Sequence, residues 1–123
     1  DDEEGEEASS IEGQELAVVE TSGRKSTYEL KNADEFILKI VSTGETWISV
    51  ENTSGNSFFQ GMLVKGSEKE SETIDLTNEQ EIKIIAGNTM NTEIYINDEK
   101  LEYAVSPQNE VRQDIFIRYV KEQ

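Results

Sequence analysis

The sequence contains no cysteine and no histidine. Without cysteine the chain has neither a disulfide framework nor a thiolate metal site. The two absences together exclude a Ser-His or Cys-His nucleophile pair, and the lack of histidine removes the commonest zinc ligand. No glycine-rich phosphate loop precedes a helical pattern. We therefore expect a protein that is not an enzyme, binds no metal and needs no cofactor.

Basic residues are also scarce, with 11 Lys and Arg against 27 Asp and Glu, a formal net charge of −16. Residues 1–20 alone hold nine of the acids and none of the bases. A field of this sign repels nucleic acid, so we expect no nucleic-acid partner for this domain. The apolar runs are far shorter than the roughly 20 residues of a membrane span. We therefore expect no direct membrane insertion by this chain.

The first part of the chain is predicted to be an acidic, disordered linker over residues 1–25. Its opening, "DDEEGEEASSIEGQ", has almost no apolar side chain that could offset the entropy lost on ordering. Two short segments, residues 15–20 and 26–30, flank a Ser-Gly turn and could be strands or part of the tether. Because the chain begins with Asp1 rather than Met and shows no signal peptide, we expect it to be a piece of a longer protein.

From residue 36 onward apolar and polar side chains alternate, which is typical of half-buried strands. The fold class predicted for residues 26–123 is all-β, a single antiparallel, immunoglobulin-like β-sandwich of about seven short strands. The expected core residues are Phe36, Leu38, Ile40, Ile48, Val50, Phe59, Leu63, Ile82, Ile84, Ile115, Ile117 and Tyr119.

Two hairpins are predicted from their turns. In "TWISVENTSGNSFFQGMLV" a turn at Ser54-Gly55 pairs Val50 with Phe59 on the core face and Trp47 with Met62 on the opposite face. A second hairpin around "NDEK" is expected to pair Ile96 with Leu101 and Ile94 with Tyr103, which leaves Tyr95 on an outer face.

A candidate interaction patch follows from these faces and comprises Trp47, Met62, Phe58 and Tyr95. Tryptophan and methionine are enriched at interface centres. Trp47 could instead be a covered marker of the fold, which is the interpretation favoured here. A second hypothesis is a glycan-binding module in which Trp47 and Tyr95 stack on sugars of the cell wall.

Several motifs together resemble one bacterial family. The stretch from Tyr28 to Glu70, with "WISV" at 47–50 and "FQGM" at 59–62, is similar to the opening of the C-terminal, extracytoplasmic domain of RodZ proteins of the low-GC Gram-positive type. "EIKIIAGNTMNTEIYINDEKLEY" at 81–103 and "DIFIRY" at 114–119 are similar to the later strands of that domain.

The resemblance implies a non-catalytic domain on the extracytoplasmic face of the bacterial cell membrane, carried by a single-pass membrane protein. Its expected partners are membrane-embedded or extracytoplasmic proteins of the elongation machinery for peptidoglycan synthesis. The family links that machinery to the MreB cytoskeleton and maintains rod shape. MreB binding would belong to a cytoplasmic part that is not in this sequence.

Overall fold

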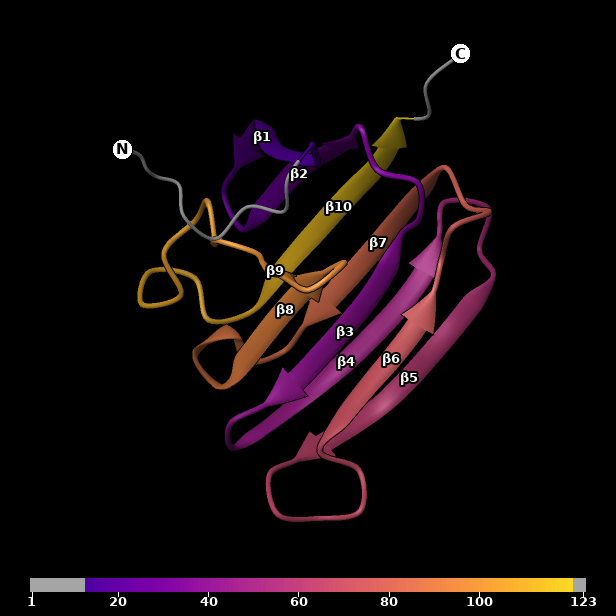
Figure 1. Ribbon diagram of the computed structural model, residues 1–123. Coiled ribbons are helices and arrows are strands. Elements are labelled where there is room, and N and C mark those ends of the chain that lie inside the picture. Colours follow the sequence, from indigo (N-terminus) through magenta and orange to yellow (C-terminus); the bar gives the residue numbers. More distant parts are fainter. Residues whose placement is uncertain (1–12, 121–123) are drawn as a thin grey trace.

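The computed structural model describes residues 13–120 and is built almost entirely of strands (Figure 1). Its ten strands are β1 (Glu15–Ser22), β2 (Lys25–Lys31), β3 (Ile37–Ser42), β4 (Glu45–Asn52), β5 (Ser57–Val64), β6 (Ser71–Asp75), β7 (Glu81–Ala86), β8 (Thr92–Ile96), β9 (Glu99–Lys100) and β10 (Gln113–Val120). One 3-10 turn, η1 (Thr89–Asn91), precedes β8. Within residues 13–120 no helix has the length and hydropathy of a membrane span.

The strands form two sheets that pack face to face (Figure 1). The larger sheet has the order β1-β2-β10-β7-β4-β5, and the smaller has the order β6-β3-β8-β9. The predicted β-sandwich is therefore confirmed. It has more strands than the seven or so expected, because both open candidates near the N-terminus form strands. One pairing is parallel, that of β2 with β10, whereas the other strand pairs are antiparallel.

The sheet begins earlier than expected, at β1. This strand forms a hairpin with β2 around Gly23, whose φ of 60° suits a glycine. Leu16 packs against the core, so β1 has a side chain that secures it to the domain, although Val18 and Val19 are exposed. The expected linker of residues 1–25 thus overlaps a strand. Residues 1–12, its most acidic part, lie outside the described residues.

The core lies between the two sheets and is purely hydrophobic at its centre. The expected core residues are buried except Phe59, which is half-buried. Phe36 and Tyr119 meet edge to face with ring centroids 5.6 Å apart. Each fully buried aliphatic or aromatic side chain contributes about 1.5–3 kcal/mol, which allows a domain without cross-links to fold.

The side chains of one tyrosine and one glutamine of the larger sheet bind the segment that connects β9 to β10. The Tyr28 hydroxyl on β2 donates to the carbonyl of Glu102 (2.7 Å) and accepts from the backbone amide of Ala104 (2.9 Å). The buried side chain of Gln113 donates to the carbonyls of Val105 (2.9 Å) and Glu110 (3.0 Å). These bonds tie the segment between β9 and β10 to the larger sheet.

The register of the first hairpin matches the prediction over most of its length. Trp47 pairs with Met62 and Val50 with Phe59, but a β-bulge then shifts the register so that Glu51 pairs with Ser57 rather than Phe58. Phe58 is the extra residue of this bulge.

The second hairpin is shifted by two residues from its predicted register. Ile96 pairs with Glu99 and Tyr95 with Lys100, rather than Ile96 with Leu101. The cause is a two-residue turn in which Asn97 and Asp98 both have positive φ, 51° and 72°. A shift of two preserves the faces, so Tyr95 still points outward.

Among the residues of this turn, we expect Asn97 to contribute most to stability, because its side chain connects the turn after β8 to the start of β3. Its side chain accepts from the Ile37 amide (2.6 Å) and donates to the carbonyl of Glu35 (2.7 Å) and to Gln14 (2.8 Å). We expect Asn97→Ala to cost about 2–4 kcal/mol in chemical denaturation, because it loses these bonds and places alanine in the left-handed region. Asn97→Gly keeps the backbone freedom and should cost about 1 kcal/mol less. Equal stability of the two variants would contradict a backbone contribution.

Candidate functional site

Trp47 and Met62 form an apolar pair on the outer face of the larger sheet. They lie opposite each other on β4 and β5, while their neighbours Ile48 and Leu63 point into the core. Trp47 is 36% exposed and Met62 is 47% exposed. Trp47 is therefore not a covered marker of the fold, contrary to the interpretation favoured from the sequence.

Residues of β7 lie next to this apolar pair on the outer face of the larger sheet. Ile85, which is half-buried on the outer face, pairs with Ser49 of β4, two residues from Trp47. Ser49 lies on the same face and is only 6% exposed. The Gly87 amide donates to the Trp47 carbonyl (2.8 Å), and a Cβ at Gly87 would lie 3.4 Å from that of Trp47. Gly87 therefore places no side chain of β7 beside Trp47 in this row.

The other two members of the expected patch lie elsewhere. Phe58 sits at the β5 bulge and packs against the core. Tyr95 lies on the outer face of the smaller sheet, between Lys39 and Lys100, and its hydroxyl donates to Glu93 (2.9 Å). Because the outer faces of a two-layer sandwich point in opposite directions, Trp47 and Tyr95 share no platform on which one sugar chain could stack.

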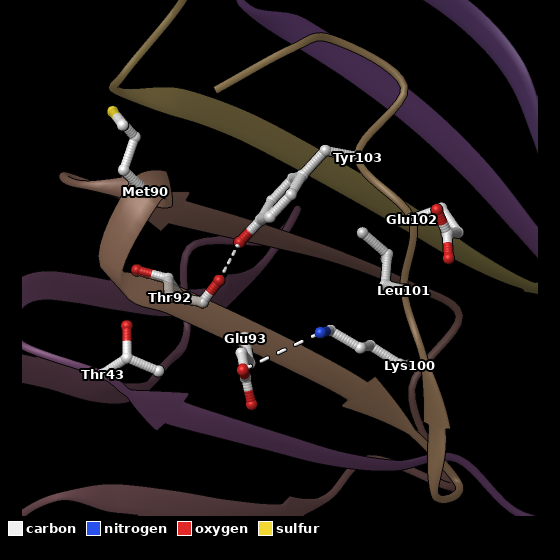
Figure 2. Close-up of a pocket in the computed structure, with 8 residues that line it drawn as sticks. All are labelled: Thr43, Met90, Thr92, Glu93, Lys100, Leu101, Glu102 and Tyr103. Carbon is white, nitrogen blue, oxygen red and sulfur yellow. Dashed lines mark hydrogen bonds and ion pairs between the residues drawn. The ribbon is translucent and has the colours of Figure 1, made fainter. Parts of the chain in front are cut away.

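A hollow of about 330 Å³ lies at the edge of the smaller sheet, where β9 ends and leaves part of β8 uncovered (Figure 2). Its lining residues are Thr43, Met90, Thr92, Glu93, Lys100, Leu101, Glu102 and Tyr103. The Tyr103 hydroxyl donates to the Thr92 carbonyl at 2.7 Å, and Lys100 lies 3.8 Å from Glu93 (Figure 2). The polar groups of the hollow are thus largely paired with one another.

The raised pKa values among the described residues belong to tyrosines, whereas hydrogen bonds from the side chain and the backbone amide of Thr77 lower the pKa of Asp75. Burial, followed by the nearby Tyr28 and Glu93, raises the pKa of Tyr103 well above its usual range. Burial also raises the pKa of Tyr28. Among residues 13–120 no group of three or more carboxylates is arranged to hold a metal ion. The arrangement of exposed groups is suited to binding, with Trp47 and Met62 as its apolar part.

Sequence reasoning missed the contribution of β7 to this surface. Ile85 and Gly87 reach Trp47 only through the pairing of β4 with β7, which joins segments far apart in the chain. A signal was present, because "IIA" at 84–86 breaks strict alternation and places one isoleucine outward.

The sequence of the chain is similar to that of a known protein family, and the family agrees with the observed fold. Two packed sheets with an exposed apolar pair define a β-sandwich domain suited to binding. The model of the RodZ C-terminal domain family matches residues 39–113, and the chain therefore belongs to that family. The family is a structural or interaction module and not a known enzyme family.

One curated relative is the uncharacterized membrane protein YmfM of Bacillus subtilis (strain 168). The two are 30% identical over 109 residues, which cover 89% of this chain and 37% of the relative. The chain thus spans little more than a third of that protein. No solved structure matches the chain.

Tyr103 provides a test of the β8 edge. Tyr103→Phe should cost about 1 kcal/mol at neutral pH, because it removes the bond to the Thr92 carbonyl. Because the folded-state pKa of Tyr103 is raised, its contribution is present below the unfolded pKa of about 10 and is lost as the pH rises through the folded value. The stability difference between wild type and variant should therefore shrink above about pH 10.

Urea denaturation at a series of pH values from neutral to alkaline would measure this difference. Tyr95→Phe is the matched control, since its hydroxyl bonds to Glu93 at the surface and should change stability by less than about 0.5 kcal/mol. A Tyr103→Phe deficit that stays constant across the alkaline range would contradict the assigned pKa shift.

Proposed function

We propose that the chain is the non-catalytic, extracytoplasmic domain of a RodZ-like single-pass membrane protein. In this role it links the MreB cytoskeleton, bound by another part of the same protein, to the peptidoglycan elongation machinery and so supports rod shape. The observation that carries the proposal is the family match over residues 39–113.

Two further observations support it. The relative from Bacillus subtilis is a membrane protein by name, and this chain corresponds to 37% of its length, which leaves room for a membrane anchor and a further domain in a protein of that kind. The Trp47–Met62 pair offers an exposed apolar contact for membrane-embedded or extracytoplasmic proteins of the machinery.

The glycan-binding alternative has less support. It requires aromatic side chains that act on one carbohydrate chain, and Trp47 and Tyr95 lie on opposite outer faces. Trp47 next to Met62 is an arrangement better suited to an apolar protein contact.

The double variant Trp47→Ala/Met62→Ala tests the role of the exposed pair in the full-length protein. We expect at least a roughly tenfold loss of co-purified elongation proteins after in-cell cross-linking, together with wider cells, because the pair forms the apolar centre of the contact. Stability should fall by only about 1–2 kcal/mol, since both side chains are partly exposed.

Tyr95→Ala is the control, because it removes an aromatic side chain from the opposite outer face. It should leave both cell width and partner capture unchanged. Normal partner capture by the double variant would show that the apolar pair is not the contact, and a collapse of its thermal stability would place the pair in the structural core instead.

A further inference from the structure

The outer face of the larger sheet carries an unusual concentration of positive charge around β10. Two arginines from different segments approach one carboxylate, with Arg112 3.7 Å and Arg24 4.0 Å from Asp114. Both distances exceed hydrogen-bonding range. The two arginine side chains are 46% and 51% exposed, so their guanidinium groups keep donors available for a further anion.

Phe116, two residues further along β10, holds two more cations on the same face. The Lys25 ammonium lies 4.9 Å from the centre of its ring and the Lys83 ammonium 5.8 Å from it. Cation–π contacts of this kind contribute about 0.5–1 kcal/mol each at exposed sites. They hold the two lysines of β2 and β7 over the middle of the sheet. We refer to Arg24, Lys25, Lys83 and Arg112 as the β10 basic cluster.

The cluster stands out against the charge of the whole chain. Four of 11 basic residues gather here in a protein of net charge −16. The carboxylates beside them are Asp114, Glu51 opposite Lys83 on β4, and Glu20 of β1, which pairs with Thr27 in the same row as Phe116. Two other cations of this sheet lie beside carboxylates: Arg118 is 3.7 Å from Glu29 and 3.6 Å from Glu81, and Lys31 is 3.5 Å from Glu29. The β10 basic cluster is thus a local excess of positive charge.

The cluster is continuous with the apolar pair. Gln113 pairs with Ala86, so Arg112 precedes β10 at the level of Gly87, and Gly87 bonds to Trp47. Gly87 has no side chain to separate them. In the next outward-facing row of the sheet, Ile85 of β7 pairs with Asp114 of β10 on one side and with Ser49 of β4 on the other. One surface therefore crosses β10, β7, β4 and β5. The β10 basic cluster lies at one end of it, and Trp47 and Met62 lie at the other end.

We propose that this surface binds an extended acidic segment of a partner protein. The carboxylates of the segment lie over the β10 basic cluster, and an apolar or aromatic side chain packs on Trp47 and Met62. The proposal rests on the proposed function as an interaction module and specifies the chemistry of its partner. Charge complementarity supports it, because an acidic segment that avoids the acidic remainder of the domain meets a local excess of positive charge at the β10 basic cluster.

A lipid surface or a simple polyanion fits less well. An anionic membrane would extend beyond this surface and would also meet the carboxylates that lie further along the same sheet, such as Glu29 and Glu81. A polyphosphate chain would engage the cations but would leave Trp47 and Met62 without a contact. A peptide supplies both a carboxylate and an apolar group within a few residues.

Trp47 is the chain's only tryptophan, so its fluorescence reports directly on this surface. The 123-residue chain is titrated with an acidic peptide of about ten residues that carries one central phenylalanine and no tryptophan. We expect a saturable change in fluorescence and weaker binding as salt is raised. The same peptide with Gln in place of Glu should bind roughly tenfold more weakly or not at all.

Charge-reversal variants locate the binding. Lys25→Glu/Arg112→Glu should weaken peptide binding by roughly tenfold or more. Lys39→Glu/Lys100→Glu makes the same change in net charge on the outer face of the smaller sheet and should leave affinity within about twofold. Because Lys25 packs on Phe116, Arg24→Gln/Arg112→Gln serves as a second variant that spares the ring.

Three outcomes would overturn the proposal. One is equal binding of the Glu and Gln peptides, and another is equal loss of affinity in the charge-reversal pair and its control. The third is binding of polyphosphate or of vesicles rich in anionic lipid as tightly as the peptide, with the same dependence on Arg112.

The proposed function is tested separately in cells. If Trp47→Ala/Met62→Ala loses elongation proteins while Lys25→Glu/Arg112→Glu keeps them, the interaction module stands and the acidic partner segment does not. If the unmodified protein captures no elongation protein, the proposed function itself fails, whatever the peptide titration shows.

Discussion

The pairing of β2 with β10 is the constraint on which the larger sheet depends. β10 lies between β2 and β7, so it joins the N-terminal hairpin to the strands that carry Trp47 and Met62. In the described part of the chain, β2 pairs only with β1 and β10. Without β10 the sheet would divide into a two-stranded ribbon and a three-stranded remainder, and an isolated two-stranded hairpin is marginally stable in water.

The same strand also connects the core with the outer surface. On its inner face Ile115, Ile117 and Tyr119 are buried against the smaller sheet. On its outer face Asp114 and Phe116 meet cations that come from the turn before β2, from β2 itself, from β7 and from the loop before β10. Because side chains of a strand alternate between faces, core packing fixes the position of the outer residues. The placement of the basic cluster is therefore a consequence of the core.

Local patterns in the sequence were sufficient for the sandwich class, for most of its core and for the Trp47–Met62 pair. That pair was predictable because a hairpin with a Ser-Gly turn has few possible registers. The register of the second hairpin was predicted two residues away from the observed one, because "NDEK" allows a turn of two or of four residues and only the fold shows that Asn97 and Asp98 both adopt positive φ. The parallel β2–β10 pairing joins residues far apart in sequence and leaves no periodic signal. The basic cluster and the contribution of Ile85 therefore emerged only with the fold.

The net charge and the basic cluster act over different distances, which reconciles an acidic protein with an acidic partner segment. At physiological ionic strength the Debye length is about 8 Å, so the charges of the opposite sheet are largely screened from a ligand bound on this face. Contacts within a few ångströms of Arg112 or Lys25 are screened much less. The general acidity therefore governs which surfaces a partner avoids during encounter, whereas the cluster and the apolar pair govern what holds it once bound. A small region of β10, β7 and β4 can thus have a binding preference opposite to that implied by the composition of the whole chain.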